Sequence, residues 1–532
     1  MNTNKLQGIV PTVAPSWAEF DPTSYFADTT YMVTINRALT NFTFSQANVT
    51  LVFAGGRFTG SGTITGNYTT FITEPVQTFD NGFSFAGTWK QEKIYAENFD
   101  TISSMNSNAA PAINKALQFS NVSGCRVKLL GKTYTITTPI NILGNTTLEG
   151  TIMGPSYTSD SAVSKEGTVI LASGTINAIY ILTTGNTSSN TDCYRFVLNH
   201  LNIRHTGTGM GINIEAVSAS GLIPRSGKIS DIKISHTLST GNYGIRVAGG
   251  SYIEFNHIFI NGGKGVLLEG NYMQEFLWFN KVILNGVSLT SFEIQHGNHI
   301  YLTEVDTNDS NVGLMINNYS GGTYCIYVNR LNSTRCGVGI YVRADSDYLT
   351  RVYVSDSSIY QNTSKSPTAA INFDRTSASY LISECEFKNI TIDTDGGVSS
   401  SFFSVKENNN CLLRCIFENI RTIRKTQLGP SNKSTFISAP QGGSFSATGN
   451  GSTTIFTTYI CDVPYTPSPF PGNPIVVVNA NLVSSSTPIS IPFRVYTVNT
   501  LQAACTLNVV FATPPASGVF VIINYILTGY YT

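Results

Sequence analysis

Charged side chains are scarce in this sequence. Asp, Glu, Lys and Arg make up 12% of the 532 residues, and their charges cancel. A nucleic-acid binder needs a basic surface, so that class of protein is excluded. No apolar run approaches the roughly 18 residues of a membrane span, so we expect no membrane insertion. The first residues lack the basic and apolar segments of a secretory signal, which favours folding in a cytoplasm.

The cysteines follow no recognisable pattern. Their number is odd, nine in all, and they are scattered along the chain. Cys411 and Cys415 have no histidine partners at zinc-site spacing, so we expect reduced, mostly buried thiols. Phosphate-binding, zinc-protease, calcium-loop and serine-hydrolase motifs are also missing. The sequence therefore predicts no metal and no cofactor.

Asn, Ser, Thr and Gly are abundant, whereas Lys and Glu are scarce. This composition favours short strands and tight turns over helices. From about residue 196, a unit of roughly 25 residues recurs, with three short strands per unit. The residues at equivalent corners are His200, Asp231, His257, Lys281, Glu304, Arg330, Asp356, Glu384 and Cys415.

Short strands with alternating burial at this period predict an all-β fold built on a right-handed single-stranded parallel β-helix. Successive coils stack about 4.8 Å apart, and equivalent side chains form rows. The segment APAINKALQFS (110–120) is the best helix candidate and is expected to cap the solenoid. We divide the chain into a β module (1–99), the capped β-helix (100–425), a linker (426–452) and an antiparallel β-sandwich (453–532).

These features resemble the pectate-lyase-like β-helices of bacteriophage tailspikes. The segments LVFAGGRFTGSGTITGNYTTFI and QTFDNGFSFAGTWKQEKIYAENF are similar to the small β module that precedes such helices. The Tyr95–Phe99 stretch and TISSMNSNAAPAI depart from the turn and the acidic stretch usual in that family. The resemblance implies a homotrimer in a virion tail, attached to a tail or baseplate protein. It also implies a bacterial surface polysaccharide as partner at the host cell surface, with trimerisation or attachment through the C-terminal domain.

Four coils in succession carry an outward aromatic residue in the strand before the corner. Phe255, Phe279, Leu302 and Val328 are expected to point inward, so the residue before each one points outward. An exposed aromatic row suits the stacking of sugar rings. The alternative is a row covered by a neighbouring subunit or loop. The row consists of Trp278, Tyr301, Tyr327 and Tyr353.

The stretch HIYLTEVDTND places two carboxylates near this row. Glu304 and Asp306 share a face at a separation of about 6.6 Å, within the range for inverting glycoside hydrolysis. Glu304 lies between Lys281 and Arg330, whereas Asp306 has uncharged neighbours, so their pKa values are expected to differ. The alternative for Glu304 is a structural salt bridge in a row of alternating charges.

Other polar residues compete for a role. Glu269 and Glu293 are expected to form a pair between coils, and Glu275 to lie in a turn at the edge of the aromatic face. His299 is expected beside the aromatic row, with Arg351 two coils later, and Arg330 at the corner. No catalytic motif of the family is present, so no catalytic role carries over from the resemblance.

The predicted function is a trimeric phage tailspike that binds and cleaves a bacterial capsule, exopolysaccharide or O-antigen. Glycosidic hydrolysis by paired carboxylates is the favoured reaction. A non-catalytic adhesin or structural fibre is the first alternative, and a polysaccharide lyase the second. A lyase needs a base, such as His299 or a tyrosine, and a group that neutralises a uronate.

Overall fold

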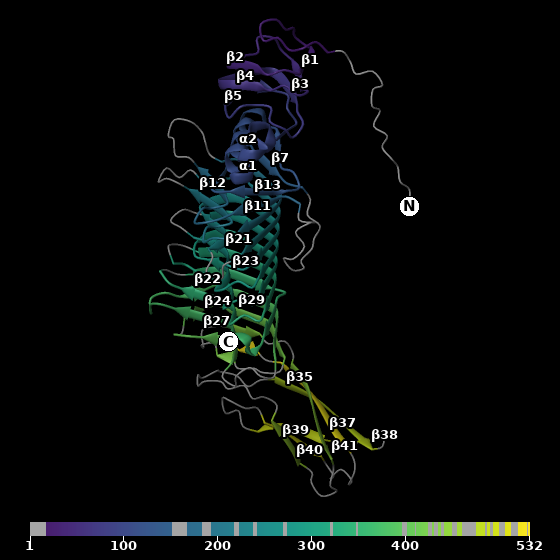
Figure 1. Cartoon of the computed structure of the whole chain (residues 1–532). Helices are drawn as coiled ribbons and strands as arrows, with labels where there is room; N and C mark the ends of the chain where they lie inside the picture. Colours follow the sequence, from purple (N-terminus) through teal and green to yellow (C-terminus); the bar gives the residue numbers. More distant parts are fainter. Residues whose placement is uncertain are drawn as a thin grey trace.

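The protein is described by a computed structural model. It covers residues 17–151, 167–183, 193–216, 223–237, 242–269, 274–319, 323–346, 349–395, 402–409 and 411–423, and the backbone of the strands from 428 onward. The chain forms a long column of stacked coils, with the N-terminal strands at one end and the C-terminal strands at the other (Figure 1). The prediction of an all-β parallel β-helix is confirmed.

Each central coil contributes one long strand to one parallel sheet and one short strand to a second. The long strands are β13 (Val197–His205), β15 (Lys228–His236), β17 (Gly250–Asn261), β19 (Gln274–Asn285), β21 (Gly297–Asn308) and β23 (Thr323–Thr334). In the later coils the same position is divided between two strands, β25 (Leu349–Ser355) with β26 (Ser358–Gln361), β28 (Ile382–Ser383) with β29 (Glu386–Thr394), and β31 (Leu412–Leu413) with β32 (Ile416–Ile423). The short strands are β9 (Ile140–Ile142), β12 (Ile179–Thr183), β14 (Ile212–Ala216), β16 (Tyr243–Ala248), β18 (Lys264–Leu268), β20 (Thr290–Ile294), β22 (Val312–Asn317), β24 (Val338–Ala344), β27 (Ala369–Arg375), β30 (Phe403–Glu407) and β33 (Leu428–Gly429).

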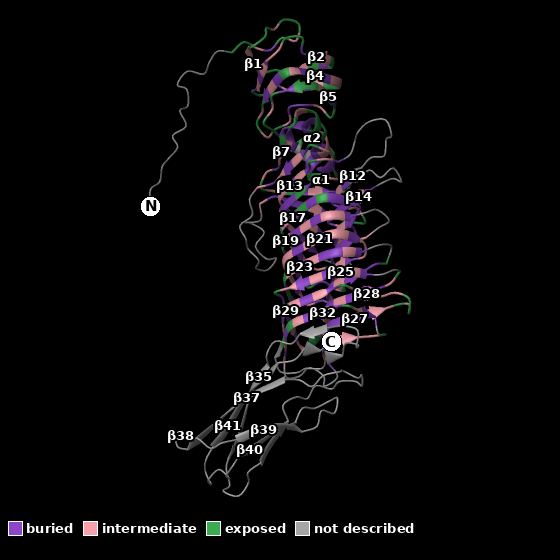
Figure 2. Ribbon diagram, turned by 180° about the vertical axis from the view of Figure 1, so that it is seen from behind, coloured by how far each residue is buried: buried purple, intermediate pink, exposed green. Residues whose placement is uncertain are grey.

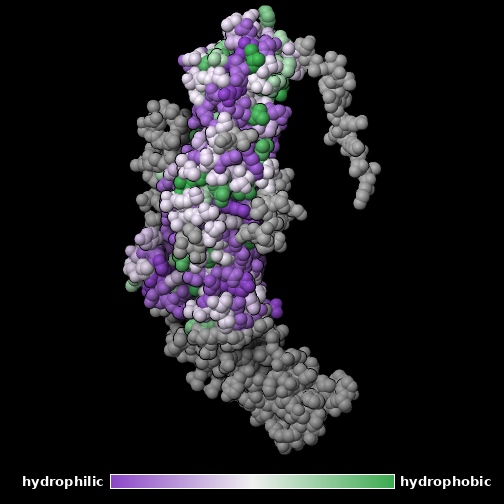
Figure 3. Space-filling view, viewed as in Figure 1, coloured by the Kyte–Doolittle hydropathy of each residue, from purple (hydrophilic) through white to green (hydrophobic). Residues whose placement is uncertain are grey.

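The core is a thin apolar column inside the coils (Figure 2). The register pairs Phe255 with Phe279, Phe279 with Leu302, and Leu302 with Val328. All four side chains are buried, as predicted from the alternation. By contrast, the described surface in Figure 3 is mainly hydrophilic or intermediate, with small scattered hydrophobic spots.

The N-terminal end of the column is closed by a helix, as predicted. Helix α2 (Ala110–Ser123) buries Ile113, Ala116 and Leu117, and follows η1 (Ala96–Phe99) and α1 (Ile102–Ser107). The first coils follow directly with β7 (Arg126–Lys128), β8 (Thr133–Ile136), β10 (Thr147–Glu149) and β11 (Val169–Ala172). Phe119 of the helix also packs on Phe85 and Trp89 of the N-terminal module, so the helix joins two apolar cores.

The N-terminal module is itself a small parallel coil. Its strands are β1 (Thr30–Val33), β2 (Arg37–Thr43), β3 (Thr50–Phe53), β4 (Phe58–Ile72) and β5 (Gly82–Trp89), whereas β6 (Lys93–Tyr95) pairs with β7 in the β-helix. The register aligns Thr30 with Thr50 and Thr50 with Thr70. This narrower coil has a core of packed aromatic rings, and its repeat was not predicted from the sequence.

At the C-terminal end of the solenoid, the parallel ladders continue past residue 425. Strand β33 pairs with β30, and β34 (Thr435–Ile437) pairs with β32. Antiparallel sheets follow, one of β35 (Gln441–Thr448), β41 (Phe520–Thr528), β37 (Ile475–Ser484) and β38 (Thr487–Ile489), the other of β36 (Ile455–Tyr459), β40 (Thr506–Phe511) and β39 (Phe493–Val498). The domain boundaries stay a prediction, but the segment expected as a linker contains strands.

Seven cysteines lie in the fully described part of the chain, and all seven are buried free thiols, as expected. No helix among the described residues is long and apolar enough to cross a membrane.

Candidate functional site

Every central long strand bends at two residues with left-handed backbone angles. In β21 these residues are His299 and Glu304, each with φ of 55°. At the second bend of each coil, the strand passes from one face of the solenoid to the next. The side chain of the residue at this bend points outward. The row of second bends, called the corner row here, consists of His200, Asp231, His257, Lys281, Glu304, Arg330, Asp356, Asn389 and Asn419.

The last two predicted members of this row were wrong. Glu384 and Cys415 were expected at the corner, but Glu386 pairs with Tyr353, which places Glu384 beside Arg351 at the first bend. Asn389 occupies the corner instead and donates to the Asp356 carboxylate at 2.9 Å. Both bends have apolar neighbours on each side, so the sequence pattern does not distinguish them.

Left-handed angles cost free energy for most side chains, and Asn, Asp and His tolerate them better than Lys, Glu and Arg do. Asn occupies the corner in the last two coils, whereas Lys, Glu and Arg occupy it from residue 281 to 330. Backbone strain tends to be retained where a side chain serves a function. The middle of the corner row is therefore the first place to look for chemistry.

The corner side chains pair with one another along the solenoid. Arg330 Nη1 lies 2.7 Å from Glu304 Oε1. His257 Nδ1 lies 2.7 Å from Asp231 Oδ1, and His200 Nε2 lies 3.5 Å from Asp231 Oδ2. The salt bridge proposed as the alternative role for Glu304 is therefore present.

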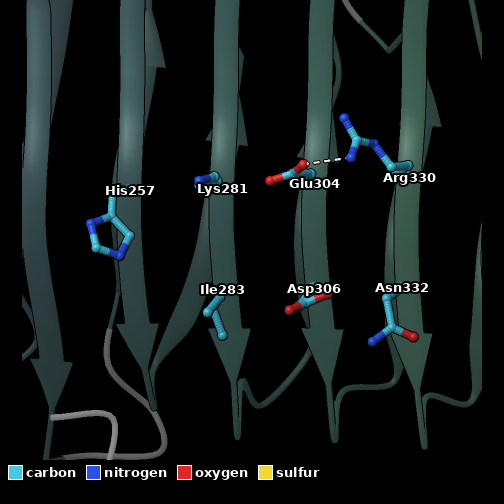
Figure 4. A pocket seen from close by; sticks show the side chains of 7 residues that line it. All are labelled: His257, Lys281, Ile283, Glu304, Asp306, Arg330 and Asn332. Carbon is cyan, nitrogen blue, oxygen red and sulfur yellow. Dashed lines mark ion pairs between the residues drawn. The ribbon is translucent and has the colours of Figure 1, made fainter. Parts of the chain in front are cut away.

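A groove runs beside the middle of this row. His257, Lys281, Glu304 and Arg330 line one side, and Ile283, Asp306 and Asn332 line the other (Figure 4). The two sides come from strands β17, β19, β21 and β23, which lie side by side in register. One chain thus supplies the whole groove, and both predicted catalytic carboxylates lie in it.

The two carboxylates have different surroundings. Asp306 is half-buried between Ile283 and Asn332. Burial raises the pKa of Asp306, and the nearby Glu304 carboxylate adds to the rise, while a hydrogen bond with Asn332 opposes it. Glu304 instead contacts a cation. Unlike environments for two neighbouring carboxylates are what general acid–base catalysis requires.

The predicted aromatic row exists as a continuous stack on the face before the corner. Ring centroids are 5.8 Å apart for Trp278 and Tyr301, 5.0 Å for Tyr301 and Tyr327, and 5.1 Å for Tyr327 and Tyr353. The planes differ by 7°, 7° and 11°. Parallel rings this close touch one another, so neighbouring rings shield part of each face of Tyr301 and Tyr327. The ring edges and the phenol hydroxyls are then the more accessible contacts for a sugar.

A second aromatic stack lies two residues earlier in the same strands. Of its three rings, only His299 was predicted from the sequence to lie beside the aromatic row. Tyr252 stacks on Phe276 at 4.9 Å, and Phe276 stacks on His299 at 4.8 Å. Tyr252 and Phe276 were not assigned to a row from the sequence. They lie at the first bend of their strands, where the side chains point outward. Arg351 continues this row two coils later and lies 3.6 Å from Glu384.

The remaining predicted carboxylates lie away from the groove. Glu275 is half-buried beside Phe276, within β19 rather than in the turn that was expected. Glu269 and Glu293 belong to the short-strand side of the coil. Glu269 pairs with Arg246 at 2.5 Å, and Glu293 accepts from Tyr243 and Gln295.

Tyr243 donates a hydrogen bond to Glu293 at 3.2 Å. Burial is the largest cause of the raised pKa of Tyr243, and the charges of Glu293 and Glu269 raise that pKa further. Glu269 and Glu293 therefore have partners of their own on the short-strand side and do not line the groove. No group of three or more His, Cys, Asp or Glu side chains suited to a metal ion occurs in the described part of the chain.

No protein-family model matches the chain, and no curated protein matches its sequence. Solved structures with similar folds include the A-module of mannuronan C-5 epimerase AlgE6 from Azotobacter vinelandii, at 14% identity and a TM-score of 0.44, covering 65% of this chain and 99% of that one. The tailspike gp49 of Pseudomonas phage LKA1 is 10% identical, with a TM-score of 0.32 and coverages of 79% and 92%. The gp42 tailspike of Acinetobacter phage vb_AbaP_AS12 is 12% identical, with a TM-score of 0.35 and coverages of 78% and 81%.

At these identities the likeness concerns the fold alone. Phage tailspikes and a β-helix enzyme are thus among the structures similar to this chain, as the resemblance in sequence implied.

Proposed function

We propose that this chain is a phage tailspike that binds a bacterial surface polysaccharide and hydrolyses a glycosidic bond in the groove. One observation carries the proposal: Glu304 and Asp306 share the groove in unlike surroundings. Glu304 is ion-paired with Arg330, whereas burial and the Glu304 charge favour the protonated form of Asp306. An ion-paired carboxyl group beside one with a raised pKa suits the base and the acid of an inverting glycosidase.

In the proposed reaction, Asp306 donates its proton to the glycosidic oxygen as that oxygen leaves the sugar. The Glu304 carboxylate removes a proton from the water that attacks the anomeric carbon from the opposite side. One water is consumed, and one hydroxyl forms on each product. Two strand positions separate the Cα atoms of Glu304 and Asp306 by about 6.6 Å, close to the carboxyl separation at which an attacking water fits.

The test is incubation of the full chain with a panel of purified bacterial capsules, exopolysaccharides and O-antigens. Hydrolysis releases reducing ends, and the products together weigh one water more than the substrate. Elimination by a lyase adds no water and leaves an unsaturated sugar, so product mass separates the two reactions. Loss of activity in Glu304→Gln and in Asp306→Asn is expected, while wild-type rates in both would move the reaction to another site.

The Glu304–Arg330 ion pair favours a second candidate, a non-catalytic host adhesin. Arg330 pairs with the Glu304 carboxylate whether or not that carboxylate performs chemistry. Such pairs between opposite charges in neighbouring coils stabilise the solenoid. Under this proposal, the chain binds a polysaccharide of the panel and releases no product from it.

We also propose a homotrimer attached to a tail or baseplate protein of the virion, acting at the host surface. The support is the resemblance in fold and the antiparallel strands after residue 440, in the region expected to trimerise. Native mass spectrometry tests the assembly: three times the chain mass of 57.6 kDa is expected, and a monomer at micromolar concentration would contradict it.

A further inference from the structure

The groove extends unevenly from the two carboxylates. Glu304 and Asp306 belong to the third of its four coils. Two coils lie on one side, contributing Lys281 with Ile283 and then His257, and one coil lies on the other, contributing Arg330 with Asn332. At about 4.8 Å per coil, the carboxylates are roughly 10 Å from the His257 end and 5 Å from the other. A sugar chain laid along the groove therefore reaches further past them on the His257 side.

The surface beneath the two sides also differs. The outward row through Asp306 continues to Ile283 and Phe259 on the His257 side. On the other side it continues to Asn332 and Ser358. Ile283 lines the groove, and Phe259 lies just beyond it in the next coil of the same row. Both side chains are partly exposed. Apolar side chains in register on an outward face provide a surface for the C–H face of a sugar, which the polar side lacks.

Polar groups border the apolar pair. His257 is held by Asp231 through the 2.7 Å contact, which fixes the orientation of its ring at the end of the groove. Lys281 is exposed between His257 and Glu304. Lys233 Nζ lies 5.9 Å from the centre of the Phe259 ring, one coil beyond. An apolar floor with oriented polar groups at its edge is typical of a binding site for a small polar ligand.

We propose that Phe259 and Ile283 form the floor, and His257 and Lys281 the rim, of a two-sugar subsite on one side of the bond that is cleaved. Asn332 and Arg330 form a shorter, polar subsite for one sugar on the other side. Asp231 is a positioning residue, because it acts through His257. This inference rests on the proposed function. It adds on which side of the cleaved bond the polysaccharide binds more tightly, and that the two sides hold different numbers of sugars.

The test uses the wild-type chain and the variants Phe259→Ala, Phe259→Leu, His257→Ala and Asp231→Asn. The probe is the set of oligosaccharides made by partial acid hydrolysis of whichever panel polysaccharide the wild type binds. His200→Ala is the matched control, because His200 also contacts Asp231 but lies outside the groove. Binding is measured by calorimetry, and products are measured by chromatography.

Phe259→Ala and His257→Ala are expected to weaken binding about three- to tenfold, the size of one lost aromatic or hydrogen-bonded contact. Phe259→Leu should keep most of the affinity, Asp231→Asn should weaken binding less than His257→Ala, and His200→Ala should match wild type. A three-sugar oligosaccharide labelled at its reducing end should be cut at only one of its two linkages, so that the label appears in the disaccharide or in the monosaccharide but not in both. With Phe259→Ala, KM should rise while kcat stays within about twofold, because uniform binding is lost.

The outcomes separate the two proposals. Cleavage with wild-type KM in Phe259→Ala and His257→Ala overturns the subsite and leaves the hydrolase intact. Weakened binding in those variants, with no product from any oligosaccharide, supports the subsite and overturns hydrolysis. If wild type binds no polysaccharide in the panel, the subsite is contradicted together with the function.

Discussion

The Glu304 carboxylate lies 2.7 Å from the Arg330 guanidinium, one coil away on the corner row. Both side chains are partly exposed, at 33% and 59%. Solvent screens such a pair, so its contribution to the free energy of unfolding is expected to stay under about 1 kcal/mol. The stability gained from this ion pair is therefore too small to explain why two charged side chains occupy left-handed backbone positions.

A double-mutant cycle distinguishes structure from chemistry at this pair. Glu304→Gln, Arg330→Met and the double variant should differ little in apparent melting temperature, with a coupling below about 1 kcal/mol. Activity should fall at least about a hundredfold in Glu304→Gln, as expected when a general base is removed. A large loss of thermal stability with unchanged kcat would instead assign the pair a structural role.

The carboxyl group of Asp306 should make the folded protein less stable when ionised. Burial and the Glu304 charge raise its pKa in the fold above the unfolded value. The unfolded state then binds fewer protons than the folded state near that pKa, so the group's contribution to stability falls as pH rises through this range. Asp306→Asn removes this penalty and should raise the melting temperature at pH 7 while activity falls about a hundredfold or more.

The gain in stability should shrink as pH is lowered and disappear below the ordinary Asp pKa of about 3.9, where wild type is also protonated. Scanning calorimetry of wild type and Asp306→Asn from pH 3 to pH 8 measures it. A variant that is less stable than wild type at pH 7 would show that Asp306 serves the fold rather than the reaction.

The aromatic row yields a test between two modes of sugar contact. Tyr301 and Tyr353 shield part of each face of the Tyr327 ring, so we expect a ligand to meet its edge and hydroxyl. Tyr327→Phe should then weaken polysaccharide binding nearly as much as Tyr327→Ala, by roughly two- to tenfold for one hydrogen bond. If sugar rings stacked on the faces, as expected from the sequence, Tyr327→Phe would bind like wild type.

The repeat in the sequence was enough to predict the coils, the capping helix and the inward positions such as Phe279 and Leu302. Burial alternates strictly there, and each coil repeats the signal. The same logic failed at Glu384, because the two bends of a coil present the same local pattern and only the hydrogen-bond register distinguishes them. The N-terminal coil was missed because its shorter period repeats only a few times, from Thr30 to Thr50 to Thr70 and from Leu39 to Gly60.

The candidate site was predictable in part for the same reason. Placing Glu304 and Asp306 on one face required only strand alternation and coil alignment. The burial of Asp306, the contact between His257 and Asp231, and the covering of ring faces in the aromatic row depend on side-chain conformation. A sequence pattern contains no information on that conformation, so these features appeared only in the structure.

A buried histidine pair predicts loss of stability in acid. His205 and His236 stack with ring centroids 5.5 Å apart, and both are buried. His205 accepts from the Gly207 amide at Nδ1, and its Nε2 lies 2.8 Å from the Ile176 carbonyl oxygen. Neither ring nitrogen of His236 has a hydrogen-bond partner among the described residues. Burial, followed by the proximity of His205, lowers the pKa of His236 from 6.5 to about 4.

The fold therefore holds His236 neutral, whereas the unfolded chain takes up a proton below about pH 6.5. Stability due to this group is complete above that pH and is lost progressively as pH falls to about 4, by about 3 kcal/mol in total. His236→Phe keeps an aromatic ring beside His205 and removes the titration, so its melting temperature should fall less than that of wild type between pH 6.5 and 4. Parallel melting curves for the two proteins over that range would contradict a neutral buried His236.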